Sequence, residues 1–246
     1  MDTQTLVIMA LLMGLGAMLY TSVGHAGASA YLAIMAIFGV EPAVMRPTAL
    51  VLNILVASYT TLRFARAGQV DWRLALPFMA GAVPLAFIAG GIALPAANYR
   101  PLVGAILFLA AVRLLWPRPL GRQKTVGRPP LWGALASGAA VGGLSGLTGT
   151  GGGIFLSPIL LFFGWAEPRR ASGVAAAFIL VNSLAGLAGN LSGIGRLPPE
   201  LPWLILAVGA GATIGSTLGL SRLTGPRLMQ VLGVVLLIAG GKLLLT

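Results

Sequence analysis

Two glycine-rich segments hold the residues whose types and spacing are best suited to binding a ligand. The first break segment reads Gly24-His25-Ala26-Gly27-Ala28, and the second reads Gly149-Thr150-Gly151-Gly152-Gly153. Both interrupt apolar sequence, and each is followed by an apolar run (29–38 or 154–163) of about half the ~20 residues that a spanning helix needs. Irregular backbone inside a membrane is tolerated only where protein or a cavity surrounds it. The two segments therefore predict two broken helix hairpins that meet near the middle of the membrane.

A short helix that begins at each break segment would offer backbone donors to an anion. The first N–H groups of a helix lack intrahelical partners, and the helix dipole places about half a positive charge there. Glycine lets a ligand approach the backbone closely and permits unusual backbone angles. Two such helix starts that face each other would bind an oxyanion such as sulfite, sulfate or a sulfonate without a buried lysine or arginine.

The alternative role for glycine in an apolar helix is to let two helices cross closely. Glycines spaced four apart on one helix face are typical of such crossings. This interpretation is preferred for two sets of glycines outside the break segments, namely Gly138, Gly142 and Gly146, and Gly211, Gly215 and Gly219.

Polar residues near the break segments are further candidates for contact with the substrate. Ser29 directly follows the first segment, and the next apolar spans carry Thr48 and Asn53 in one half and Asn182 and Ser183 in the other. Polar groups inside a membrane usually face the bundle interior. Hydrogen bonding between helices is the alternative role for each of them.

His25 is the only histidine in the chain and lies within the first break segment. It would donate to the anion or carry a coupled proton, because the ordinary histidine pKa lies near neutral pH. The alternative is a neutral ring that is hydrogen-bonded to backbone at the kink. Thr150 occupies the matching place in the second segment, so the histidine serves one half only.

The composition indicates a protein whose solvent is the bilayer. Hydrophobic residues make up 57% of the 246 residues and charged residues 9%, whereas soluble domains carry about 25% charged residues. With no cysteine, one histidine and five acidic residues, the sequence predicts no disulfide, no metal site, no cofactor and no catalytic residues. The net charge of +11 does not indicate nucleic-acid binding, because the basic residues lie at the ends of apolar runs.

The chain repeats itself at a nearly constant offset. The two break segments match, Glu41-Pro42 matches Glu167-Pro168, and the offset stays between 125 and 129 residues across each half. We therefore predict a first membrane repeat at 1–116, a basic cytoplasmic linker at 117–130 and a second membrane repeat at 131–246. Each repeat is expected to contain a broken, re-entrant helix hairpin followed by three transmembrane helices. The predicted fold is thus an all-α membrane protein.

The basic residues predict how the two repeats are oriented. Cytoplasmic loops are enriched in lysine and arginine, and one orientation leaves only four of the 16 basic residues outside, namely Arg46, Arg100, Arg196 and Lys242. In this orientation both termini lie outside the cell (inner) membrane, and the second repeat is inverted relative to the first. Inverted-topology repeats are a recurring architecture of secondary transporters. Arg46 and Arg170 precede spans and are interpreted as interfacial residues, with screening of anions at the two mouths as the alternative.

The sequence resembles the TauE/SafE sulfite-exporter family, also called the toluene-sulfonate uptake permeases. The resemblance rests on the second break segment with the Pro158 that follows it, on Glu167-Pro168-Arg169-Arg170-Ala171, and on Gly68-Gln69-Val70-Asp71-Trp72. The first half departs from the pattern, because it has fewer glycines in its break segment and Ala33 where the second half has Pro158. The resemblance implies transport of sulfite, organosulfonates or related anions.

The function predicted from these features is secondary transport of a small sulfur-containing anion by alternating access, with a proton or sodium ion as a coupled partner. An anion channel with the same fold, and a permease for carboxylates or other oxyanions, are the alternatives. A membrane enzyme is disfavoured because the residues for acid–base or metal chemistry are scarce. The sequence leaves the oligomeric state, the direction of transport and the coupling ion open.

Overall fold

The computed structural model describes residues 2–115, 127–221 and 226–245, and these residues are helical and contain no strand. Of the predicted linker at 117–130, only residues 127–130 lie within the described part. The elements run in chain order as α1 (Thr3–Thr21), α2 (Ala28–Ile37), α3 (Pro42–Arg66), α4 (Trp72–Gly91), α5 (Ala96–Leu115), α6 (Leu131–Thr148), α7 (Gly153–Phe162), α8 (Pro168–Gly189), η1 (Leu191–Arg196), α9 (Leu201–Ser221) and α10 (Pro226–Leu245).

The helix lengths confirm an all-α membrane protein. Among the described residues, five helices are long and apolar enough to cross a bilayer, namely α1, α3, α4, α8 and α9. The two short runs after the break segments form α2 and α7, with 10 residues each, and both begin one residue earlier than predicted. A helix of 10 residues rises only about 15 Å, half the thickness of the hydrocarbon layer.

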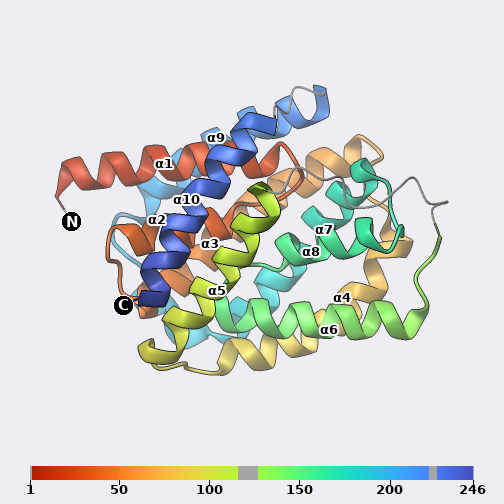
Figure 1. Cartoon of the computed structure of the whole chain (residues 1–246), viewed down its shortest axis with the longest axis horizontal. Coiled ribbons are helices and arrows are strands. Elements are labelled where there is room, and N and C mark those ends of the chain that lie inside the picture. Colours follow the sequence, from red (N-terminus) through yellow and green to blue (C-terminus); the bar gives the residue numbers. More distant parts are fainter. Residues whose placement is uncertain (1, 116–126, 222–225, 246) are drawn as a thin grey trace.

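Two closely packed helix pairs, α4 with α6 and α1 with α9, form two sides of the bundle (Figure 1). In both pairs the glycines spaced four apart face backbone of the partner helix. A Cβ atom on Gly142 would overlap the carbonyl oxygen of Ala82, and a Cβ on Gly215 would overlap that of Met18. These glycines therefore have the role that their spacing predicted, which is to let two backbones approach each other.

Helices α3 and α8 pack against each other at the centre of the bundle and hold many of its buried polar residues. They run antiparallel. The residues that line two cavities show this direction. One cavity is lined by Pro42 at the start of α3 and Asn190 just after α8. Another is lined by Phe64 near the end of α3 and Pro168 at the start of α8. The middle of this helix pair is the place where the two break segments meet.

Candidate functional site

In each break segment, a glycine with a left-handed backbone directly precedes the short helix. Gly27 precedes α2 with a φ of 101° and Gly152 precedes α7 with a φ of 82°, and neither residue has a side chain to cap its helix. L-residues with a side chain rarely adopt such angles. The first N–H groups of both helices therefore need acceptors from elsewhere in the fold.

His25 joins the first break segment to the start of α7. Its Nε2 atom lies 3.0 Å from the carbonyl oxygen of Gly153 and 3.2 Å from the hydroxyl of Ser157, while its Nδ1 atom lies 3.1 Å from the carbonyl oxygen of Val23. A neutral ring can donate to only one of the two carbonyls, whereas a doubly protonated ring donates to both. The site therefore accommodates the ring with one proton or with two, because the Ser157 hydroxyl can donate to an unprotonated Nε2.

Asn53 on α3 connects the start of α2 with the second break segment. Its Oδ1 atom accepts a hydrogen bond from the N–H of Ala28 at 3.1 Å, and its Nδ2 atom donates to the hydroxyl of Ser183 on α8 at 3.2 Å. A Cβ on Gly151 would overlap the amide nitrogen of Asn53, so the glycine makes room for this side chain. Asn53 thus supplies the cap that Gly27 cannot provide.

A small cavity of about 10 Å³, the central cavity, lies where the starts of α2 and α7 meet. That volume is close to the minimum that holds one water molecule. No charged side chain lines it, and the hydroxyls of Ser29 and Tyr20 bond to each other beside it at 2.7 Å. The lining residues are Tyr20, His25, Ala26, Gly27, Ala28, Ser29, Asn53, Thr150, Gly153, Ile154 and Ile179.

The other predicted site residues lie around this cavity without lining it. Gly24 packs against the carbonyl of Ser172, and Gly149 packs against the side chain of Arg46. Gly151 and Gly152 accommodate the neighbouring side chains of α3 and α8. Asn182 donates to Ser145 and to the carbonyl of Gly151, and its Oδ1 is buried without a partner, as is the hydroxyl of Thr48. Ser183 contacts the cavity only through Asn53.

Four residues close to the cavity were not predicted from the sequence, namely Tyr20, Ile154, Ser157 and Ile179. The internal repeat could have identified Ile179, because it aligns this residue with Asn53. If Glu41 is aligned with Glu167, Asn53 falls on Ile179, and both residues line the cavity. Ser157 lies one helical turn after Gly153, on the face that meets His25.

Two larger cavities lie at opposite ends of the α3–α8 pair. One has a volume of about 480 Å³ and includes Arg46 near the start of α3. The other has a volume of about 530 Å³ and includes Ser22 and Ser172, near the start of α8. Asn53 and Ile179 line the central cavity and lie midway along α3 and α8, so this cavity falls between the two larger ones.

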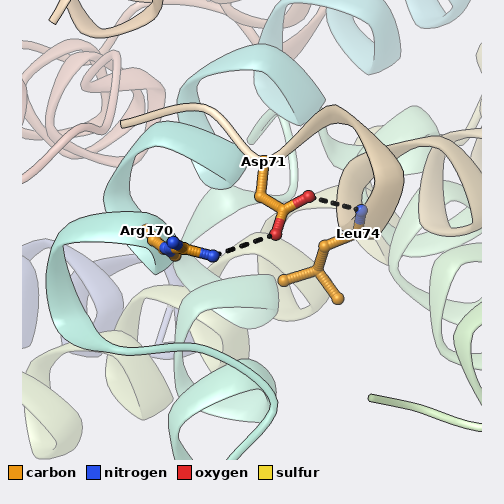
Figure 2. Close-up of polar contacts among 3 residues, drawn as sticks. All are labelled: Asp71, Leu74 and Arg170. Carbon is orange, nitrogen blue, oxygen red and sulfur yellow. Dashed lines mark hydrogen bonds and ion pairs between the residues drawn. The ribbon is translucent and has the colours of Figure 1, made fainter. Parts of the chain in front are cut away.

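An ion pair links α4 and α8 at the end of the bundle where both helices begin (Figure 2). The carboxylate of Asp71 accepts the N–H of Leu74 at 3.1 Å, which caps α4, and its other oxygen lies 3.4 Å from a guanidinium nitrogen of Arg170. Both side chains are partly exposed, so the pair adds little stability, roughly 0–1 kcal/mol. The contact joins the segment before α4 to the start of α8.

Comparison with known proteins identifies the family of the chain. The family model described as "Sulfite exporter TauE/SafE" matches residues 8–243. A "Probable membrane transporter protein y4hK" from Sinorhizobium fredii is 38% identical, over 99% of this chain and 100% of the relative. A "Probable membrane transporter protein YunE" from Bacillus subtilis is 24% identical, over 83% of this chain and 82% of the relative. No solved structure matches the chain. The chain belongs to the TauE/SafE sulfite exporter family and is a membrane transporter of that family.

Proposed function

We propose that the protein is a secondary transporter that carries a small sulfur oxyanion, sulfite or an organosulfonate, by alternating access. The observation that carries the proposal is the position of the small central cavity. It lies at the starts of α2 and α7 and between two larger cavities at opposite ends of the same antiparallel helix pair. A substrate at this point could be reached from either end by movement of the helices around it.

The chemistry of the central cavity favours an anion. Two helix starts contribute partial positive charge, and no carboxylate lines the cavity to oppose it. In this structure the Oδ1 atom of Asn53 accepts from the N–H of Ala28, a position that a sulfite oxygen would occupy in the loaded state. Hydroxyls of Ser29 and Thr150 lie at the same cavity and can donate to further oxygens.

The helix pairs support two repeats of inverted topology. Under the offset between the break segments, α3 corresponds to α8, and these helices run antiparallel. The same offset relates the α1–α9 pair to the α6–α4 pair, and both are built on glycines spaced four apart. Two related halves in opposite orientation would give two similar conformations, which is the basis of alternating access in this proposal.

The small volume at the centre favours a transporter over an anion channel with the same fold. A channel requires a continuous path, whereas a cavity of about 10 Å³ has no room for sulfite until the helices around it move. The names of the relatives also describe transporters. Coupling to a proton at His25, or to a sodium ion, forms part of this proposal.

The test is counterflow in proteoliposomes that are preloaded with unlabelled sulfite and supplied with labelled sulfite. We expect a saturable, transient accumulation of label, with competition by sulfate, thiosulfate and small sulfonates in an order that identifies the substrate. Protein-free vesicles are the control. Large single-channel currents in a planar bilayer would contradict the transporter, and the absence of any anion flux would contradict anion transport altogether.

A further inference from the structure

The cavity of about 480 Å³ at the start of α3 collects most of the basic residues that were predicted to face outside. Arg46 of α3, Arg100 of α5 and Arg196 of η1 all line it, and Glu41 is the only acidic residue among its lining residues. Three arginines and one glutamate among the described lining residues make this cavity basic. Low-dielectric walls concentrate the field of such charges and raise the local concentration of an anion.

Arg46 is buried beneath this cavity, with only 6% of its surface exposed. Its guanidinium donates to the carbonyl oxygens of Ile92 and Ala89, at 2.9 Å each, and to that of Gly90. A cation is favourable at the carboxyl end of a helix such as α4. Within the described residues its partners are carbonyl oxygens, and its Nε–H is buried without a partner. The guanidinium therefore places beneath the floor of the cavity a positive charge that no carboxylate of the described residues contacts.

The floor of the same cavity touches the second break segment. Tyr99, which lines the cavity, donates its hydroxyl to the carbonyl oxygen of Thr148 at 2.9 Å, at the last residue of α6. A Cβ on Gly149 would lie 3.2 Å from the side chain of Arg46. An anion that enters the cavity is thus one layer of residues away from the backbone that leads to α7.

Basic residues also line cavities at the opposite end of the bundle. Among the described residues, Arg169 lines the cavity of about 530 Å³, and Arg73, Arg128 and Arg170 line another cavity together with Asp71. The position equivalent to Arg46 under the Glu41–Glu167 alignment is Ser172, so within the described residues a buried arginine occurs at one end of the α3–α8 pair only.

We infer that the Arg46–Arg100–Arg196 cavity is a loading site for the transported sulfur oxyanion, used from one membrane face only. This inference rests on the proposed function. A volume of about 480 Å³ lies in the usual range for small-molecule sites, so an organosulfonate or a partly hydrated inorganic anion fits. The cavity concentrates the anion electrostatically, and the uncharged central site then accepts it.

The test compares the Arg100→Gln, Arg196→Gln double variant with wild type in oriented proteoliposomes of zwitterionic lipid, with labelled sulfite offered from each face. On the face with the cavity we expect kcat/KM to fall about tenfold at low salt, and the loss to shrink at high salt because screening weakens the wild-type advantage. On the other face kcat/KM should stay within a factor of two. Arg73→Gln is the matched control, since Arg73 lines a cavity at the opposite end of α4.

Each other result overturns the inference in a distinct way. Equal losses on both faces would make the arginines structural, and unchanged kinetics on both faces would remove the loading site while leaving transport by the wild type intact. A loss that appears only when anionic phospholipid is present would assign the cavity to a lipid headgroup. If the wild type itself shows no saturable flux, it is the proposed function that fails.

Discussion

Replacing Asn53 by aspartate tests whether the start of α2 is the anion site. Asn53 accepts the N–H of Ala28 at 3.1 Å and contacts the hydroxyl of Ser183 at 3.2 Å. Aspartate has nearly the same shape, so an oxygen can keep the first contact, and the Ser183 hydroxyl can rotate to donate to the second oxygen. The substitution therefore changes charge more than packing, and it places a carboxylate where we propose that sulfite binds.

The expected loss of affinity follows from the distance between the two negative groups. An anion that shares the donors of α2 with this carboxylate would lie about 4 Å from it, where two unit charges repel by about 4 kcal/mol at an effective dielectric constant of 20. Since each 1.4 kcal/mol corresponds to a factor of ten, the affinity for sulfite should fall on the order of 10³-fold. Asn53→Ala removes the cap without adding charge. It should lower stability by about 1–3 kcal/mol, because a buried N–H loses its acceptor, and it should not cause the same loss of affinity.

The assay is a sulfite titration of the purified protein, followed by the thermal unfolding midpoint, with labelled flux in proteoliposomes as the second readout. Asn98→Asp is the matched control, because it makes the same chemical change at an exposed position on α5. If Asn53→Asp is folded and binds sulfite within about threefold of the wild-type affinity, the anion does not bind at the start of α2.

Three further changes test other parts of the structure. His25→Ala should flatten the pH dependence of flux around neutral pH, because the ring is the proton carrier that we propose, and an unaltered pH profile would exclude it as the coupling group. Gly142→Ala should lower the unfolding free energy by about 1–3 kcal/mol, because its Cβ would overlap backbone of α4. Gly143→Ala on the same helix should have almost no effect, since its Cβ meets only ordinary contacts. Equal thermal unfolding midpoints for the two variants would refute the close crossing. Gly152→Ala and Gly39→Ala should each cost roughly 1–2 kcal/mol of backbone strain, because both glycines have a positive φ. Only Gly152→Ala should reduce sulfite flux by tenfold or more, because Gly39 faces open space. Flux that falls equally in both variants would contradict a special role for the break segment.

The sequence predicted the local features of the fold accurately because they depend on local patterns. Glycines that interrupt apolar sequence located the starts of α2 and α7 to within one residue, and glycines spaced four apart located the close crossings. Such features depend on the backbone angles and side-chain volumes of neighbouring residues. Whether the break segments bind an anion stays a prediction that the experiments above address.

The pairing of distant residues could not be predicted in the same way. Asn53 and Asn182 look equivalent in the sequence, since each lies in the span after a broken hairpin, yet Asn53 lines the central cavity and Asn182 bonds to Ser145 on α6. The difference is about one helical turn in the alignment of the two halves, which sends the two amides to different neighbours. The burial of Arg46 could not be predicted for a similar reason, because it depends on carbonyl oxygens at the end of α4, more than 40 residues away in the chain.

The distribution of charge along the proposed path suits a transporter that must release its substrate. Each helix start at the central cavity contributes about half a charge through backbone dipoles, which vary little when the site changes its access. A full guanidinium at that point would hold an anion more strongly in a cavity of about 10 Å³ and would slow its release. In this protein the lining arginines stand instead in the larger cavities, which adjoin the path. The charge of the arginines can therefore speed the approach of an anion. The partial charges and hydrogen bonds at the central cavity then bind the anion selectively and still permit its release.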